Sequence, residues 1–554
     1  MQLSPSAHRD TFCRDNLPPA HLWPDLRPLD HHPERLNCAE VLLDQTLARF
    51  GPDRPCLLGG GKRWTYGEVR DRVNRLANVL TDHFGLIPGN RVLLRGPNTP
   101  WLAVCWLAVV KAGGVVVATM PLLRTGELAT VRDTAKPFLA LCDDRFTEAL
   151  EPLRDTMTVV GEEELDKLCA AAPTDYAAVD TAADDVVLLG FTSGTTGRPK
   201  ATMHFHRDVL AIADTFSAHT VRPRPDDLFT GTPPLAFTFG LGGLLVFPLR
   251  AGAATLLLER QTPVELAKTA HANGVTVLFT APTVYRAILA AGKADLLRGV
   301  RRCVSAGEAL PAQVSEDFHA ATGIRIIDGI GATEMLHVFI SAADEEVRPG
   351  ATGKVVPGFE AAVLDEEGRP VPDGVAGRLA VRGPTGCRYL ADDRQAAYVH
   401  DGWNITGDTY VRDAEGYFWY QARNDDMIIS AGYNIAGPEV EAALNRHPSV
   451  VDCGVVAAPD EERGWIVKAF VIAEGVTAAD LQDFVKATIA PYKYPRAVEF
   501  VTELPRTDTG KLQRFRLREW AADGTPPDVL SPATARSTAD RRPGPAPAAA
   551  AQIR

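Results

Sequence analysis

The sequence predicts an α/β protein with a large N-terminal domain of layered α/β subdomains plus a β subdomain, followed by a small mobile C-terminal α+β domain. Between about residues 50 and 420, short apolar runs alternate with helical patterns, and several of the runs end in glycine-rich turns. This alternation is typical of sheets covered by helices, where ligands bind at the carboxyl ends of the strands. After Arg423 a second, shorter set of helical and strand patterns begins. A chain of 554 residues is long enough for more than one domain.

The large domain, residues 1–424, contains the clearest strand and helix patterns. Its strand-like runs are RVLLRG (91–96), VVLL (186–189), TVLFTA (276–281), RCVSAG (302–307) and IRIID (324–328). The most apolar segment, Trp101 to Val110, is too short to span a bilayer, so it predicts a buried helix. From residue 362 the strands are punctuated by glycine, which predicts the β subdomain; examples are RLAVRG (378–383) and GYFWYQAR (416–423).

The small domain is predicted over residues 425–524. Pro438 can open a helix that runs toward His447, and Thr477 with Asp480 resembles a capping pair at the start of a second helix. The expected strands are VVDCGVVAA, IVKAFVIA and AVEFVTEL, which precede the polar loop PRTDTGKLQR. Residues 525–554 are rich in Pro and Ala and short of aromatic residues, so we predict a disordered tail.

Composition excludes several classes of protein. A net charge of −12 argues against a general nucleic-acid binder. Nine scattered cysteines form no C-x-x-C pair, which excludes the usual zinc and disulfide patterns and fits reduced thiols in a cytoplasm. The first nineteen residues carry charges and prolines where a signal peptide needs an apolar stretch. We therefore expect a cytoplasmic protein with no membrane segment.

The stretch FTSGTTGRPKATMHFH, residues 191–206, predicts an anion site. It follows an apolar run and precedes a helical pattern, so it reads as a strand, a mobile polar loop and a helix. Backbone N–H groups in a glycine-rich turn, with hydroxyls and a lysine, can hold a polyphosphate. It is not the common P-loop, because Arg198 and Pro199 separate Gly197 from Lys200. Taken alone, the stretch is more typical of a flexible surface loop.

Four further stretches support the interpretation of residues 191–206 as a phosphate site. They are SAGEAL (305–310), DGIGATEM (328–335), GWNITGD (402–408) with GYFWYQARNDD (416–426), and PRTDTGK (505–511). Together, in this order and spacing, they resemble the acyl-adenylate-forming superfamily of acyl-CoA synthetases, peptide-synthetase adenylation domains and firefly luciferase. The resemblance covers residues 1 to about 520. It implies that a carboxylate attacks the α-phosphate of ATP, releasing pyrophosphate, and that a thiol, usually coenzyme A, then displaces AMP.

The resemblance implies ATP, Mg²⁺ and coenzyme A, and it assigns residues to the first two. The phosphate cradle would be Thr192, Ser193, Gly194, Thr195, Thr196, Gly197 and Lys200. Thr333 resembles the α-phosphate contact and Glu334 the Mg²⁺ ligand, a hard oxygen donor for a hard cation. The nucleoside site would comprise Gly307, Glu308, Asp328, Gly329, Gly331, Asp408 and Arg423. Without the resemblance these residues equally fit solvated turn acids, tight-turn glycines, a helix cap and a surface ion pair.

The small domain carries the remaining assignments. Lys511 resembles the catalytic lysine that acts with Thr333 and Glu334 at the carboxylate and α-phosphate, although a lysine in such a loop is usually just solvated. Asp425 matches the hinge at which the small domain rotates between the two steps. Gly432 and Tyr433 would line the coenzyme A channel.

Two stretches resemble benzoate–CoA ligases and indicate an aromatic acid. PPLAFTFGLGG (233–243) and TEMLHVF (333–339) imply an acid pocket of Phe237, Thr238, Phe239, Gly240, His337 and Val338. A neutral or charged imidazole could hold the carboxylate or a ring substituent, and a merely packed histidine is the alternative. The N-terminal DTFCRDNLPP and LWPDL resemble 2-aminobenzoate–CoA ligases, so we expect a small benzoate-type acid, with 2-aminobenzoate first.

Three alternatives remain. The chain could adenylate an aryl acid and load a separate carrier protein, or it could be an acyl-CoA ligase for another small acid. The absence of an attached carrier-protein serine motif favours free coenzyme A. A non-catalytic nucleotide-binding scaffold is disfavoured because the assigned residues are all retained, namely Lys200, Thr333, Glu334, Asp408, Arg423 and Lys511. The sequence leaves the oligomeric state open.

Overall fold

The computed structural model describes residues 3–193, 199–423, 426–430, 433–460, 464–489, 491–507 and 510–523. Contacts divide the chain into two compact units, Met1–Tyr420 and Gln421–Arg554. This division lies within β20 (Phe418–Arg423), close to the boundary expected from the sequence. The predicted α/β class, with a large N-terminal and a small C-terminal domain, is confirmed. The predicted tail from residue 525 lies outside the described residues.

The first sheet of unit 1 has six strands and is mostly parallel. Its order is β6 (Thr158–Gly161), β5 (Leu139–Cys142), β3 (Arg91–Arg95), β4 (Val115–Thr119), β7 (Val186–Ser193) and β8 (Pro199–Phe205). Only the β7–β8 pair is antiparallel. The sheet therefore brings the polar stretch at residue 191 to one edge of a buried parallel layer.

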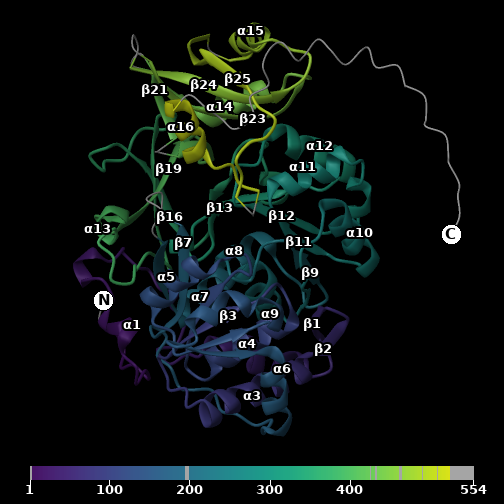
Figure 1. Ribbon diagram of the computed structural model, residues 1–554, viewed down its shortest axis with the longest axis vertical. Helices are drawn as coiled ribbons and strands as arrows, with labels where there is room; N and C mark the ends of the chain where they lie inside the picture. The colour runs from purple at the N-terminus through teal and green to yellow at the C-terminus, as the bar shows by residue number, and fades with distance from the viewer. Residues whose placement is uncertain are drawn as a thin grey trace, which may run out of the picture. The chain divides into compact units, whose positions relative to one another are not determined.

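The second sheet has nine strands, and its central strands are parallel. Its order is β15 (Lys354–Val355), β14 (Val338–Ser341), β13 (Ile327–Gly331), β12 (Arg302–Ala306), β11 (Val277–Thr280), β9 (Leu228–Gly231), β10 (Ala254–Leu256), β1 (Pro55–Gly59) and β2 (Lys62–Thr65). Figure 1 shows β9, β11, β12 and β13 side by side, with α10, α11 and α12 next to them.

A third sheet forms the predicted β subdomain. It contains β16 (Glu360–Leu364), β17 (Ala376–Arg382), β19 (Trp403–Arg412) and β18 (Val399–His400), with β20 paired to β19. Neighbouring strands of this sheet are antiparallel where their register is defined. It begins at residue 360, close to the change of pattern expected at 362.

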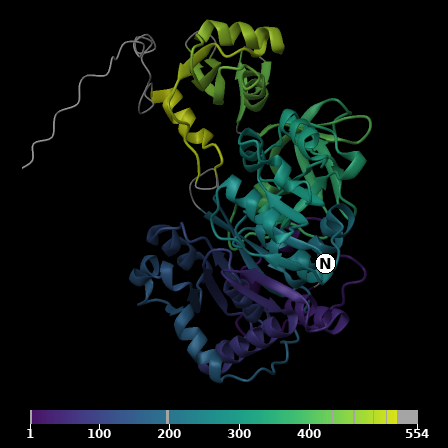
Figure 2. The same cartoon turned by 90° about the vertical axis from the view of Figure 1, so that its right-hand side faces the viewer.

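The helices of unit 1 cover these sheets, as Figure 2 shows from the side. They are α1 (Phe12–Asp15), α2 (Thr46–Phe50), α3 (Tyr66–Asn78), α4 (Pro100–Lys111), α5 (Thr125–Ala135), α6 (Glu162–Ala171), α7 (His206–Ile212), α8 (Thr238–Leu241), α9 (Phe247–Ala251), α10 (Pro263–Asn273), α11 (Pro282–Ala290), α12 (Ala312–Thr322) and α13 (Gln395–Tyr398). The predicted apolar helix is α4, and all its residues are buried. Lys111, which ends it, is buried because Asp44 and Asn74 accept hydrogen bonds from its Nζ at 2.8 and 2.7 Å. In the part of the chain that is described, no helix is both long and apolar enough to cross a bilayer.

Residues 199–205 differ from the loop expected there, because they form a strand. β8 begins at Pro199 and pairs with the end of β7, so that Thr192 lies opposite Lys200. Every second residue from Ala201 to Phe205 is apolar and buried, which is the period of a strand. The alternation is visible in the sequence, but over only five residues beside a glycine-rich stretch it does not separate a strand from a loop.

The strand expected at 324–328 is displaced toward the C-terminus. α12 ends at Thr322, the following Gly323 turns the chain with a φ of +78°, and β13 starts only at Ile327. Ile326 is fully buried, so the apolar run reflects burial before the strand begins as well as within it. The consequence for the site is that β13 extends to Gly331, two residues before Thr333.

The described part of unit 2 contains a two-stranded sheet, a three-stranded sheet and three α-helices. The strands are β21 (Met427–Ser430) with β22 (Tyr433–Ala436), and β23 (Val450–Asp460) with β24 (Gly464–Ala473) and β25 (Ala497–Phe500). The helices are α14 (Gly437–Leu444), α15 (Ala478–Thr488) and α16 (Arg514–Asp523). α15 opens with the predicted capping pair, in which the Asp480 N–H donates to Thr477 Oγ1 at 3.3 Å.

Candidate active site

A cluster of Lys200, Tyr389 and Glu334 lies at the edge where β8 meets the segment after β13. Lys200 Nζ is 3.1 Å from Glu334 Oε1, and the side chains are 16% and 8% exposed. The Tyr389 hydroxyl donates to the same carboxylate oxygen at 2.5 Å and also accepts a hydrogen bond from Lys200. The buried carboxylate is therefore held by a cation and a hydroxyl donor that come from different parts of the chain.

Tyr389 is placed by backbone pairing along the outer edge of β8. The Met203 N–H donates to the Arg388 carbonyl at 2.7 Å, and the Leu390 N–H donates to the Ala201 carbonyl at 2.9 Å. Burial and the negative charge of Glu334 hold the pKa of Tyr389 far above its usual value. The hydroxyl stays protonated, so it remains a donor to the carboxylate.

A buried ion pair stabilises the segment that carries Tyr389. Arg388 hydrogen-bonds to Asp208 on α7, and both side chains are fully buried. Although burial acts in the opposite direction, the positive charge of Arg388 holds the pKa of Asp208 below its usual value. The pair ties the segment that carries Tyr389 to the helix that follows β8.

The Thr333–Glu334 turn, η9 (Thr333–Met335), lies directly against β7. A Cβ atom on Gly190 would come within 2.8 Å of Thr333 Cγ2, so glycine is needed for this approach. Thr192, two residues further along β7, has a buried Oγ1 with no hydrogen-bond partner among the described residues. Ser193 is described only by its backbone, and the loop residues Gly194, Thr195, Thr196 and Gly197 lie outside the described residues.

A second group of residues lies on β12 and β13, which pair in parallel with Ser305 opposite Asp328. Burial raises the pKa of Asp328 to about 8, and its Oδ1 is buried without a partner in the described part. Gly307 follows β12 with a φ of +92°, and nothing lies within 4 Å of where its Cβ would be. Glu308 follows it and is half-buried.

Gly329 and Gly331 allow β13 to pair closely with β14. A Cβ on Gly329 would come within 2.7 Å of Val338 Cγ1, and one on Gly331 within 2.6 Å of the His337 carbonyl oxygen. These glycines thus have a packing role whatever they bind. Asp408 lies half-buried on β19, with its N–H donating to Thr406 Oγ1 at 3.3 Å.

An aromatic chamber surrounds His337, two residues beyond η9. Its ring lies 5.3 Å from Phe216 and 4.7 Å from Phe247 between centroids, and 5.5 Å from Phe239. Burial lowers the pKa of His337 to about 3, so the imidazole is neutral. Both ring nitrogens are buried and make no full hydrogen bond to the described residues. A neutral imidazole with open nitrogens can accept or donate one hydrogen bond to a ligand.

The other residues expected in the acid pocket range from exposed to fully buried. Phe237 is 37% exposed at the start of α8, whereas Phe239 is half-buried against the ring of Phe279 at 5.4 Å. Thr238 begins α8, and Gly240 packs so tightly that a Cβ would meet the Pro234 carbonyl oxygen at 2.1 Å. Val338 is buried and faces Gly329.

The expected residues of unit 2 are described only in part. Lys511 is exposed, and its N–H donates to Thr507 Oγ1 at 3.0 Å, while the Thr507 N–H donates to its carbonyl at 2.8 Å. Arg423 is the last residue of β20, and Tyr433 opens β22. The expected hinge, Asp425, and Gly432 lie outside the described residues.

The sequence interpretation missed Tyr389, Phe216 and Phe247. Tyr389 lies in PTGCRYLADD, between two motifs that were recognised, and a lone tyrosine carries no signal of its own. Phe216 lies in the helical pattern that follows residue 206, where η6 (Ala213–Val221) continues α7 as a π-helical segment. Only the fold shows that these rings meet His337.

Comparisons with known proteins agree on one family. A family model described as AMP-binding enzyme matches residues 43–389, and the AMP-binding enzyme C-terminal domain matches residues 439–511. Benzoate–CoA ligase of Thauera aromatica is 34% identical, with 88% of this chain and 96% of that protein covered. 3-Hydroxybenzoate–CoA ligase of Aromatoleum sp. (strain CIB) is 33% identical, with 87% and 97% covered.

A solved structure of the anthranilate CoA ligase AuaEII in complex with anthranoyl-AMP superposes with a TM-score of 0.83. It is 32% identical, with 88% of this chain and 98% of that chain covered. Anthranilate is 2-aminobenzoate. The predicted resemblance to benzoate–CoA and 2-aminobenzoate–CoA ligases is therefore confirmed.

Gly242→Ala tests how tightly the aromatic chamber is packed. An added Cβ would lie 2.3 Å from His337 Cδ2, so the imidazole must move. We expect a loss of about 1–3 kcal/mol in unfolding free energy, as for overpacking a filled core, measured as a lower urea midpoint.

The matched control is Gly126→Ala on the exposed part of α5, where nothing lies within 4 Å of the new Cβ. It should be neutral or slightly stabilising, because alanine is the better helix former. Equal midpoints for Gly242→Ala and the parent would contradict the close approach of η7 (Gly242–Val246) to His337.

Proposed function

This chain belongs to the AMP-binding enzyme family, and we propose that it uses ATP to join an aromatic carboxylic acid to coenzyme A. The acid would first become aryl-AMP, with release of pyrophosphate, and coenzyme A would then displace AMP. One observation carries the proposal. The short segment Thr333–Val338 has the Glu334 cluster at one end and the His337 chamber at the other, so a carboxylate on a buried ring would lie next to the charged groups.

The Lys200, Tyr389 and Glu334 cluster supports a site for the phosphates of ATP. Lys200, Thr192 and the loop residues would contact the phosphate oxygens, and Thr333 the α-phosphate. Glu334 fits a Mg²⁺ ligand: it is a buried carboxylate, and the described residues place no three-ligand cage around it. Mg²⁺ binds through one or two carboxylates and substrate phosphates, and it would neutralise the leaving pyrophosphate.

The turn after β12 and the strand β13 support a nucleoside site. Gly307 and Glu308 would flank the adenine from that turn, and Asp328, Gly329 and Gly331 would face it from β13, which corrects the second turn expected there. The unpartnered Asp328 oxygen can take up a hydrogen bond from the base. Asp408 and Arg423, on the paired strands β19 and β20, would bind the ribose hydroxyls.

Within the benzoate class we propose 2-aminobenzoate as the acid. The support is the similarity to the anthranilate CoA ligase and to benzoate–CoA ligases, together with the ring-lined chamber. The neutral imidazole of His337 can hydrogen-bond an amino or carboxylate group without desolvating a second charge. Phe239, Thr238, Gly240 and Val338 would complete the pocket, with Phe237 at its exposed end.

For the second step we propose that unit 2 turns about Asp425. Lys511 would serve the first step, because its ammonium stabilises the charge that builds up as carboxylate meets α-phosphate. Gly432 and Tyr433 would line the path of coenzyme A. We place the reaction in the cytoplasm, in keeping with nine cysteines that are all free thiols.

A panel of acids tests the proposed reaction. Enzyme, ATP, Mg²⁺ and coenzyme A are mixed with 2-aminobenzoate, benzoate, 3-hydroxybenzoate, coumarate or octanoate, and acyl-CoA is measured by mass spectrometry. We expect the benzoates to dominate, with 2-aminobenzoate first. Since one methylene changes binding in an apolar pocket by only roughly 1–3 kcal/mol, some overlap is expected. A preference for coumarate or octanoate over every benzoate would contradict an aryl-acid ligase, and benzoate above 2-aminobenzoate would contradict the finer assignment.

Tyr389→Phe tests whether the hydroxyl positions Lys200 and Glu334. Hydrogen bonds to charged groups contribute about 1.5–3 kcal/mol, so aryl-AMP formation should fall by a factor on the order of 10 to 100. The rate of exchange between ATP and labelled pyrophosphate measures aryl-AMP formation.

The control is Tyr66→Phe, which loses a buried hydroxyl bonded to the Ala253 carbonyl at 2.7 Å elsewhere in unit 1. It should cost stability without the kinetic loss. If both variants lose activity in proportion to their stability, Tyr389 has no specific role in positioning the site.

Lys511→Ala should separate the two half-reactions. We expect aryl-AMP formation to drop by a factor on the order of 10² to 10³, as for loss of one strong electrostatic group, while preformed aryl-AMP still reacts with coenzyme A at near the parent rate. Lys486→Ala, a partly exposed lysine of α15 paired with Asp483, is the matched control and should leave both steps unchanged. Equal loss of both steps in folded Lys511→Ala protein would show that the lysine is not specific to the first step.

A further inference from the structure

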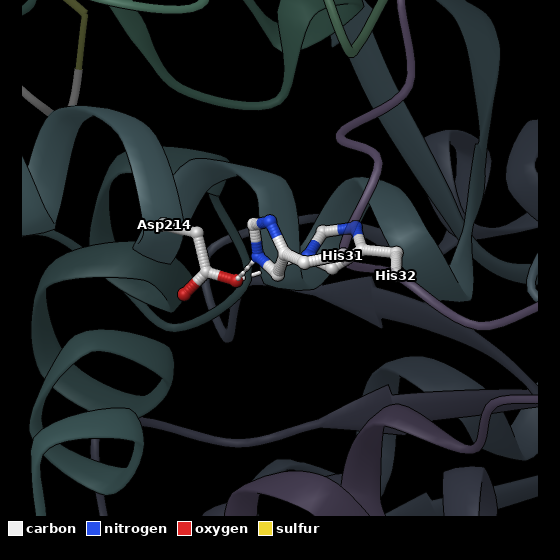
Figure 3. Close-up of side chains that lie close together, drawn as sticks. All are labelled: His31, His32 and Asp214. Carbon is white, nitrogen blue, oxygen red and sulfur yellow. Dashed lines mark hydrogen bonds and ion pairs between the residues drawn. The ribbon is translucent and has the colours of Figure 1, made fainter.

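Three metal-ligating side chains, His31, His32 and Asp214, converge outside the site described above (Figure 3). The Nε2 atoms of His31 and His32 lie 3.0 and 2.9 Å from the same oxygen, Asp214 Oδ2. Among the described residues this is the one group of three or more His, Cys, Asp or Glu side chains that are close enough to hold a metal ion. Neither the sequence interpretation nor the proposed reaction uses it.

The three residues come from two distant segments of unit 1. His31 and His32 lie in a turn of the N-terminal segment, where the His32 N–H donates to the Leu29 carbonyl at 3.1 Å. Asp214 is near the start of η6. Figure 3 shows both imidazoles directed at the Asp214 carboxylate from the same side. The turn therefore delivers two adjacent histidines to one oxygen of a helix residue.

Arg250 on α9 hydrogen-bonds to both oxygens of the Asp214 carboxylate and fixes its orientation. Its Nε donates to Asp214 Oδ1 at 2.9 Å and its Nη2 to Oδ2 at 3.2 Å. Although burial acts in the opposite direction, the hydrogen bonds from His32, Arg250 and His31 hold the pKa of Asp214 well below its usual range. A carboxylate that is itself hydrogen-bonded is typical of a metal ligand, because the outer contact sets its orientation.

We propose that His31, His32 and Asp214 bind a divalent transition-metal ion of the zinc class. Two imidazoles and one carboxylate with an open fourth position is a ligand set that such ions take. Bonds of about 2.0–2.2 Å in a tetrahedron place ligand atoms about 3.3 Å apart, so the two histidine–carboxylate separations need to widen by only a few tenths of an ångström. His32 is 5% exposed and already oriented, whereas His31 is 58% exposed and leaves a path for the ion and a water ligand.

The protons balance without an added reactant. Without metal, each neutral imidazole donates its Nε2–H to Oδ2, which only accepts. With metal, each proton moves to Nδ1 and the Nε2 lone pair binds the ion, so neutral rings release nothing and a protonated ring releases one proton.

The ion pair with Arg250 holds the Asp214 carboxylate in a fixed orientation, because Arg250 contacts both of its oxygens. The two imidazoles meet one of these oxygens, so the three side chains form a preformed chelate.

Metal binding here would clamp the N-terminal segment onto the helix beside the aromatic chamber. η6 carries Phe216, whose ring stacks on His337 at 5.3 Å and 29°. An ion bound by His31 and His32 on one side and Asp214 on the other cross-links the two segments. The site does not depend on the proposed reaction, since its ligands take no part in it.

The test uses the full-length chain without a polyhistidine tag. Co²⁺ is titrated in and its visible absorption is followed, then Zn²⁺ is added in competition. We expect one equivalent of Co²⁺ with the intense band of a low-symmetry nitrogen and oxygen site, which Zn²⁺ displaces. His31→Ala/His32→Ala should abolish the band, and His31→Ala alone, at an exposed position, should weaken Co²⁺ binding by at least about 10-fold.

The matched control is His21→Ala/His83→Ala, which removes two other exposed imidazoles and should bind Co²⁺ like the parent. No band in the parent, or equal Co²⁺ binding by the parent and His31→Ala/His32→Ala, overturns the proposal. Hydrogen exchange tests the clamp: Zn²⁺ should protect residues 29–34 and η6 in the parent and not in the double variant. Zn²⁺ binding with unchanged exchange in both segments overturns the clamp.

Discussion

The structure around the candidate site depends on one constraint, which is that the carboxylate of Glu334 is buried and must be paired. An unpaired buried charge is costly, and here a cation and a hydroxyl offset that cost at one oxygen. The partners are Lys200 on β8 and Tyr389 on the segment that pairs with β8, so satisfying one side chain fixes the six-stranded sheet against η9. The buried Arg388–Asp208 pair locks the same segment to α7.

This constraint explains why small residues lie where the segments cross. Gly190 lets β7 touch Thr333, and Gly331 lets β13 touch the backbone of His337. Each contact leaves no room for a Cβ, so the Glu334 cluster and the His337 ring are held on one rigid segment. In the proposed reaction that rigidity would keep an acid carboxylate in register with ATP, which is how positioning lowers a barrier.

The aromatic chamber and the N-terminal segment are linked through one helix. α7 and η6 follow β8 directly, and η6 presents Phe216 to His337 and Asp214 to the two N-terminal histidines. The chamber wall is therefore supported from outside by a segment nearly two hundred residues earlier in the chain. A change in the contact between Asp214 and the two histidines therefore acts on the same helix that carries Phe216, the ring stacked on His337.

Local patterns in the sequence determined the α/β class, the two-domain order, the buried helix α4 and the capped helix α15, because each depends on short-range spacing of apolar or capping residues. The motifs also identified the family, since several independent stretches agree in order. The sequence did not determine that residues 199–205 form a strand, because an alternation of only five residues beside a glycine-rich stretch also fits a loop. It could not show that Tyr389 meets Lys200 and Glu334, that Phe216 and Phe247 enclose His337, or that His31 and His32 reach Asp214. Those contacts join residues far apart in the chain, and only the packing of whole sheets and helices decides which distant side chains meet.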